Sequence, residues 1–140
     1  MTYASPVILL LGSDAALLEG LSQSLSALGY ALRVARELHE ASEIAAAEPP
    51  LIVLAASQLA GEAGSDLLRV RLAAGGARVL YHSAGDEPAT LLGSVQRSVL
   101  ADLALPLERH RLVALIQHVV QRSEATGRPS LETPPEQRAP

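Results

Sequence analysis

The chain has 140 residues, of which 49% are hydrophobic and 19% charged, and its formal net charge is −4. This length and composition are typical of one globular domain with its own core. The acidic balance argues against nucleic-acid binding through phosphate contacts, and the lack of cysteine excludes disulfides and thiolate chemistry.

The first predicted elements are a strand and an amphipathic helix. An apolar run at 7–11 ends at Gly12, and leucines then recur at helical spacing until Gly29 closes the pattern. Ser13 or Asp14 is the expected N-cap, because a short side-chain oxygen there accepts a hydrogen bond from the first turn. The N-terminal apolar run is too short for a signal peptide or a membrane span, so we expect a cytoplasmic protein.

The same alternation continues along the chain, with glycine and proline separating the elements. We predict strands at 30–35, 51–55, 77–82 and 99–105, and helices at 37–47, 65–74, 89–98 and 107–122. Several strands are continuous apolar runs, which a parallel sheet covered on both faces requires. The sequence therefore predicts a single-domain α/β fold: a doubly wound, five-stranded parallel sheet in three layers.

The predicted domain covers 1–122. A proline-rich segment at 123–140 has little that could pack, and we expect a tail or linker there. Ligands of doubly wound folds bind at the carboxyl ends of the strands, so function is expected at that edge.

The order of these elements resembles a response-regulator receiver domain of two-component phosphorelay signalling. The resemblance covers 6–121 and rests on ILLLGSDAALLEGLSQSLSALGY, PPLIVLAAS, LYHSAGDEP and ADLALPLERHRLVALI. It implies a flavodoxin-like winding with strand order 2-1-3-4-5. It also implies a phosphoryl-accepting Asp, an acidic pair that holds Mg²⁺, a hydroxyl residue, and a Lys before a Pro.

Most of these chemical positions hold other residues in this sequence. Gly12 and Ser13 replace the acidic pair, with Asp14 one place later, and Leu105 replaces the Lys before Pro106. The acceptor position falls on Ala55, or on Ala56 if the register slips by one, and only Ser83 matches the family's hydroxyl.

The joint loss of carboxylates and cation predicts a degenerate receiver, or pseudo-receiver, that is not an enzyme and has no metal or cofactor. Such a module would act through a protein partner or a homodimer, without nucleic acid or membrane. A polar stripe near the chain's last helix is a candidate interaction surface, although an ordinary solvated helix face also explains it; it comprises Glu108, Arg109, Arg111, Gln117 and Arg122. The alternative function is a small-molecule or anion-binding module that reuses the vacated pocket.

Individual residues also allow plainer interpretations. The helix-cap role explains Asp14 better than a one-carboxylate metal site does. His82 and Ser83 are adjacent in a strand and point to opposite faces, so a structural histidine is expected rather than a catalytic pair. The resemblance further implies a cis peptide bond between Leu105 and Pro106.

Overall fold

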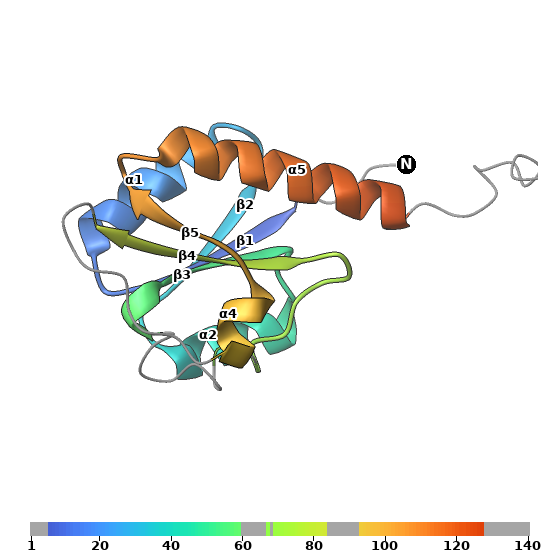
Figure 1. The fold of residues 1–140 in the computed structure, drawn as a ribbon, viewed down its shortest axis with the longest axis horizontal. Helices are drawn as coiled ribbons and strands as arrows, with labels where there is room; N and C mark the ends of the chain where they lie inside the picture. The colour runs from blue at the N-terminus through green and yellow to red at the C-terminus, as the bar shows by residue number, and fades with distance from the viewer. Residues whose placement is uncertain (1–5, 60–66, 68, 84–92, 128–140) are drawn as a thin grey trace, which may run out of the picture.

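The computed structural model describes residues 6–59, 67, 69–83 and 93–127, and it contains a five-stranded sheet (Figure 1). Its strands are β1 (Val7–Leu11), β2 (Ala31–Ala35), β3 (Ile52–Ala56), β4 (Ala77–Ser83) and β5 (Val99–Leu105). They are ordered β2-β1-β3-β4-β5, and each neighbouring pair is parallel. The expected α/β fold with strand order 2-1-3-4-5 is confirmed.

Helices cover both faces of the sheet. On one face lie α1 (Ala15–Ser26) and α5 (Arg109–Gly127), and on the other lie α2 (Leu38–Ala47) and the short α4 (Gly93–Ser98) (Figure 1). None of the helices in the described ranges combines the length and the apolar content that a membrane crossing needs. The arrangement is the three-layer, doubly wound one that the sequence predicts.

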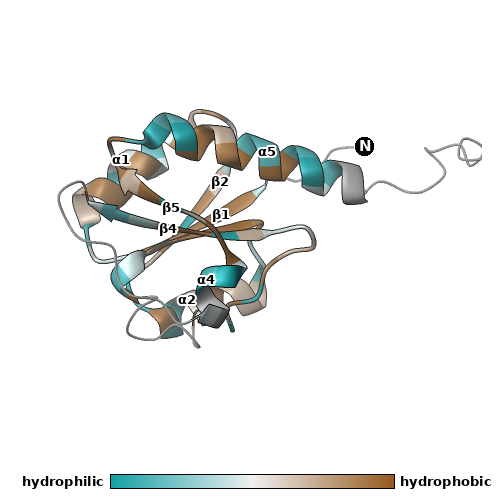
Figure 2. Ribbon diagram, in the orientation of Figure 1, coloured by the Kyte–Doolittle hydropathy of each residue, from teal (hydrophilic) through white to brown (hydrophobic). Residues whose placement is uncertain are grey.

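The sheet separates two apolar cores. Successive side chains of a strand point to opposite faces, so Ile8 and Leu10 enter the core beneath α1 and α5, while Leu9 and Leu11 enter the core beside α2. All four are fully buried. Figure 2 shows the hydrophobic strands between helices whose outer sides are more hydrophilic. Burial on both faces explains why these strands are continuous apolar runs.

Helix α1 begins at a side-chain cap. The Leu17 backbone N–H donates to the Asp14 Oδ1 atom over 3.1 Å, which confirms Asp14 as the cap among the two residues predicted for this role. Beyond the other end of the helix Gly29 has φ 98°, a left-handed conformation that favours glycine. The two residues fix where the amphipathic helix starts and where the chain turns toward β2.

The helix predicted at 65–74 is wrong over residues 69–74, which form turns and irregular chain. Leu67 is helical, and the remaining N-terminal part of that prediction lies outside the described residues.

Side-chain and backbone hydrogen bonds explain the early end of this helix. Arg78 of β4 donates to the carbonyl oxygen of Leu67 over 3.3 Å and to that of Val70 over 2.9 Å. The Ala73 N–H donates to the Pro50 carbonyl oxygen over 2.8 Å. These hydrogen bonds join residues 67–73 to the chain beside β3 and β4. The amino-acid composition of the segment does not predict them.

The other boundaries differ from the predicted ones by a few residues. β2 begins one residue late, β3 is shifted by one residue, and β4 extends by one residue to Ser83. Helix α4 begins at Gly93, and the predicted stretch 89–92 lies outside the described part. Helix α5 begins at Arg109 and continues to Gly127, five residues beyond the predicted end at 122.

Candidate functional site

The carboxyl ends of the central strands meet at one edge of the sheet. Ala56 of β3 is the register partner of Tyr81 in β4, and Ser83 of β4 is the partner of Leu105 in β5. Gly12 follows β1 directly, and its N–H donates to the Ala35 carbonyl oxygen over 3.1 Å. The structure therefore brings Gly12, Ala56, Ser83 and Leu105 to the same edge of the sheet.

The two alanines at the end of β3 occupy different environments. Ala55 is completely buried and packs with Leu9 and Leu11 in the core beside α2. Ala56 is partly buried, faces the core beneath α1 and α5, and lines a depression at the strand ends. The structure thus places Ala56, the one-residue alternative, in the position next to Gly12, and Ala55 on the opposite face.

A tyrosine fills the space beside Gly12. A Cβ atom built on Gly12 would lie 2.0 Å from the Tyr81 hydroxyl oxygen and 3.2 Å from its Cζ atom. The same point is 3.7 Å from the Ala56 Cβ atom. Because β-carbon contacts shorter than 3.0 Å essentially never occur, Tyr81 takes this position only when residue 12 has no side chain.

The hydroxyl of Tyr81 has an unusual environment. The residue is only 4% exposed, and its hydroxyl is a buried polar atom without a hydrogen-bond partner among the residues that the structure describes. Burial, and secondarily the negative charge of Asp14, raises the pKa of Tyr81 to about 12. Tyr81 is not among the predicted site residues, although Tyr81 and Ser83 are two apart in one strand and therefore share a face.

A small polar depression lies over this tyrosine, with a volume of about 120 Å³. It is lined by Ser13, Asp14, Ala56, Ser57, Gln58, Tyr81, His82 and Ser83. Asp14 is the one carboxylate among these described lining residues, and one oxygen of that carboxylate already caps α1. Among the described residues no group of three or more His, Cys, Asp or Glu side chains could hold a metal ion. Mg²⁺ prefers several oxygen ligands, so these residues do not fit it.

A larger cavity of about 500 Å³ adjoins the depression, between α1 and the turn from β5 into α5. Asp14 and Ser83 line both hollows. The remaining wall is mostly apolar, and it consists of Ala16, Leu17, Gly20, Leu21, Leu105, Pro106 and Arg109. Leu105 is fully buried, and the bond to Pro106 is cis, as the resemblance implied. Where a receiver has its lysine, this chain therefore has an apolar wall.

His82 contacts a carboxylate away from Ser83. Its Nδ1 atom lies 2.8 Å from Oδ1 of Asp102 on β5, and both side chains are largely buried. Asp102 stands near the place where receivers carry an aromatic residue on this strand. The contact agrees with a structural role for His82, as the sequence predicts.

The five residues predicted as an interaction surface lie on more than one side of α5. Glu108 pairs with Arg111 over 2.6 Å and accepts from the Ala104 N–H over 2.8 Å; these two bonds, led by the backbone one, lower the pKa of Glu108. Arg109 instead reaches α1, where its Nη1 atom donates to Ser24 Oγ over 3.2 Å.

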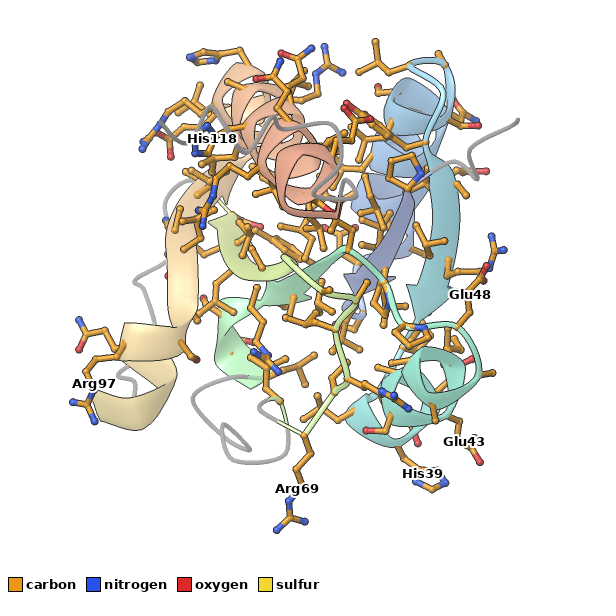
Figure 3. The ribbon with its side chains drawn as sticks, turned by 90° about the vertical axis from the view of Figure 1, so that its right-hand side faces the viewer. His39, Glu43, Glu48, Arg69, Arg97 and His118 are labelled. Atoms are coloured by element: carbon orange, nitrogen blue, oxygen red, sulfur yellow. The ribbon has the colours of Figure 1, made fainter. Side chains whose placement is uncertain are left out.

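Gln117 and Arg122 are exposed further along the helix. At about 100° per residue, Gln117 points away from the buried side of α5, whereas Arg122 lies on the same side as Arg111. Figure 3 shows His118 also projecting from α5, and Arg97 projecting from α4 on the opposite face of the sheet. The stripe is therefore not one continuous surface.

Solved structures of receiver domains share this fold. A putative response regulator from Chloroflexus aurantiacus is 21% identical, with a TM-score of 0.65, over 85% of this chain and 100% of that chain. A CheY-like receiver domain protein from Methanospirillum hungatei is also 21% identical, with a TM-score of 0.65, over 89% and 100% of the two chains.

The receiver domain of a Pseudomonas aeruginosa sensor histidine kinase, described with a magnesium ion coordinated in its active-site cleft, is 17% identical, with a TM-score of 0.64, over 84% of this chain and 99% of that chain. No protein-family model matches this sequence, and neither does any curated protein sequence. The structural comparisons show that the chain has the receiver-domain fold.

Proposed function

We propose that this receiver-fold chain is a degenerate receiver of two-component signal transduction, which accepts no phosphoryl group and works through protein–protein contact. The observation that carries the proposal is the packing of Tyr81 against Gly12. A tyrosine ring occupies the space in which an acidic side chain at position 12 would begin.

The chemistry of phosphoryl transfer explains why this replacement matters. A receiver needs a carboxylate nucleophile, oxygen ligands for a hard cation, and positive charge near the transferred phosphoryl group. Here the acceptor position falls on Ala55, or on Ala56 in the other register, and neither side chain is a nucleophile. Gly12 and Ser13 stand in place of the metal ligands, and Leu105 provides no charge. The Pseudomonas aeruginosa domain coordinates magnesium in its cleft, whereas the described residues that line the depression in this chain include one carboxylate, that of Asp14.

The replacements also support one another energetically. Removing a single member of a charged site leaves like charges crowded together or a charge without a partner. Removing carboxylates and lysine together leaves a region that an apolar side chain and an aromatic ring can fill, as Leu105 and Tyr81 do. Because the replacements at these positions fit one another, they support a stably folded domain without the phosphorylation chemistry.

A protein partner or a second copy of the chain is the proposed target of this scaffold. Two large apolar side chains near the β5 edge are exposed, Leu100 by 43% and Leu107 by 71%. Exposed apolar residues beside charged ones are frequent at protein interfaces. The net charge of −4 does not favour nucleic acid.

The test is phosphorylation by acetyl phosphate with Mg²⁺, followed by mass spectrometry of the intact chain and run beside a functional receiver. We expect no mass increase in this chain and a phosphorylated species in the control. Stoichiometric addition of one phosphoryl group to this chain would overturn the proposal.

The alternative function, ligand binding in the vacated pocket itself, has less support. Tyr81 fills the space beside Gly12, and the remaining depression is small. The open volume lies beside it, in the larger cavity.

A further inference from the structure

The cavity between α1 and the β5–α5 turn has the size and lining of a small-molecule site. Its volume of about 500 Å³ falls in the range of roughly 300–1,000 Å³ that is usual for ligand pockets. Such pockets combine apolar walls with a few polar groups, and here Leu17, Leu21 and Pro106 accompany Arg109. The lining residues determine which class of small molecule the cavity can bind.

Gly20 keeps one wall of the cavity open. Glycine inside a helix weakens that helix relative to alanine, and Gly20 lies in the middle of α1. Among the described glycines only Gly29 and Gly75 have positive φ, and a Cβ on Gly20 would meet no atom within 4 Å. Neither backbone conformation nor close packing accounts for this glycine. Its effect in the structure is to leave space in the cavity.

Arg109 supplies a positive charge that has no carboxylate partner within the described part of the chain. Its guanidinium donates to the neutral Ser24 Oγ atom, and a guanidinium carries five N–H donors. The negative charge of Asp14, on the other wall of the cavity, is already stabilised, because its carboxylate accepts a hydrogen bond from the α1 backbone at the positive end of the helix dipole. The charge in the cavity that an added ligand could pair with is therefore the positive charge of Arg109.

We propose that this cavity binds a small carboxylic acid with an apolar body, whose carboxylate pairs with Arg109. A guanidinium binds a carboxylate with two parallel hydrogen bonds. The apolar body would lie along Leu17, Leu21 and Pro106 in the space that Gly20 leaves. This site goes beyond the proposed function and does not depend on whether the chain accepts a phosphoryl group.

The experiment compares three probes that share one apolar body, octanoate, octanol and octylamine, by isothermal titration against the full chain. We expect saturable binding of octanoate in the range of about 0.1–1 mM, at least tenfold tighter than octylamine because of the charge on Arg109. Equal or tighter binding of octylamine would overturn the assignment, as would the absence of saturable octanoate binding.

Three variants then locate the site. Gly20→Leu should weaken octanoate and octanol binding by about tenfold or more, because its side chain fills the cavity. Arg109→Gln should weaken octanoate by about tenfold and leave octanol unchanged, because it removes the charge and keeps the apolar wall. Arg111→Gln is the matched control, an exposed arginine of the same helix outside the cavity, and should change neither.

The variants also separate this proposal from other occupants. Unchanged octanoate binding in both Gly20→Leu and Arg109→Gln would show that the acid binds elsewhere and would overturn the proposal. Thermal unfolding of each variant checks the fold, and Arg109→Gln remains a sufficient test if Gly20→Leu is unstable. A positive result in the acetyl phosphate assay would refute the degenerate receiver without affecting this site.

Discussion

Replacing Gly12 by alanine places a methyl group where the Tyr81 hydroxyl now lies. The added carbon would be 2.0 Å from that oxygen, about 1 Å inside the closest contact that real β-carbons make. Tyr81 is 4% exposed and packs in the core beneath α1 and α5, so its ring has little room to withdraw. Overpacking of this kind typically costs about 1–3 kcal/mol, and we expect Gly12→Ala to lower the free energy of unfolding by about 2 kcal/mol.

Removing the Tyr81 hydroxyl should relieve much of this cost. In Tyr81→Phe the nearest remaining ring position lies 3.2 Å from the new carbon, which a shift of a few tenths of an ångström accommodates. The single variant Tyr81→Phe should be as stable as wild type or about 1 kcal/mol more stable, because the hydroxyl is buried without a partner. The double variant should therefore show a coupling energy of about 1–2 kcal/mol.

Urea unfolding followed by circular dichroism measures these differences, because the chain has no tryptophan. Gly20→Ala is the matched control: this glycine has open space around its would-be Cβ, and the change should stabilise the chain by about 0.5–1 kcal/mol. The reasoning is refuted if Gly12→Ala unfolds at the wild-type urea concentration, or if the effects of Gly12→Ala and Tyr81→Phe are simply additive.

Three further predictions follow from the same site. The pKa of Tyr81 is raised to about 12, because the folded chain favours the neutral phenol over the phenolate. Stability is therefore unaffected by this group below a pH of about 10 and falls as the pH rises toward 12. An absorbance titration should show a late-ionising tyrosine that is missing in Tyr81→Phe, and identical titrations would contradict this prediction. Asp14→Ala removes the α1 cap and should cost about 1 kcal/mol in urea unfolding, whereas Asp14→Asn should cost less; equal losses would argue against capping. A triple variant with Gly12→Asp, Ser13→Asp and Ala56→Asp restores carboxylate ligands for Mg²⁺. It should bind Mg²⁺ in a calorimetric titration only when Tyr81 is also replaced by alanine, because the tyrosine occupies the space beside residue 12. Binding with Tyr81 intact would show that the ring does not block the site.

The fold could be predicted because local signals and long-range architecture agree. Apolar runs such as 7–11 need two covering layers, and Gly12 and Gly29 separate the elements clearly. The order of elements then resembles one family closely enough to give the strand order. The segment 69–74 was not predictable in this way, because Arg78 and Pro50 hold it through bonds between residues distant in sequence.

The site could be predicted only in part. The absence of a carboxylate at Gly12 and of a lysine at Leu105 is visible in the sequence, but the side chain that fills the space beside Gly12 is not. Strand alternation places Ala56 rather than Ala55 on the face of Gly12, and a one-residue ambiguity in register conceals this. Tyr81 becomes relevant only when the missing side chain of Gly12 and the β3–β4 register are considered together.

The most direct test of the central claim is a calorimetric titration of the chain with beryllofluoride, an acyl-phosphate analogue, in the presence of Mg²⁺, with an intact receiver as control. A chain whose Tyr81 fills the site and whose Asp14 caps a helix should show no binding heat under conditions in which the control binds. Binding at concentrations of about 1–100 μM would contradict the account, because it would require a metal site and a carboxylate acceptor, whereas the described residues lining this depression supply the Asp14 carboxylate alone.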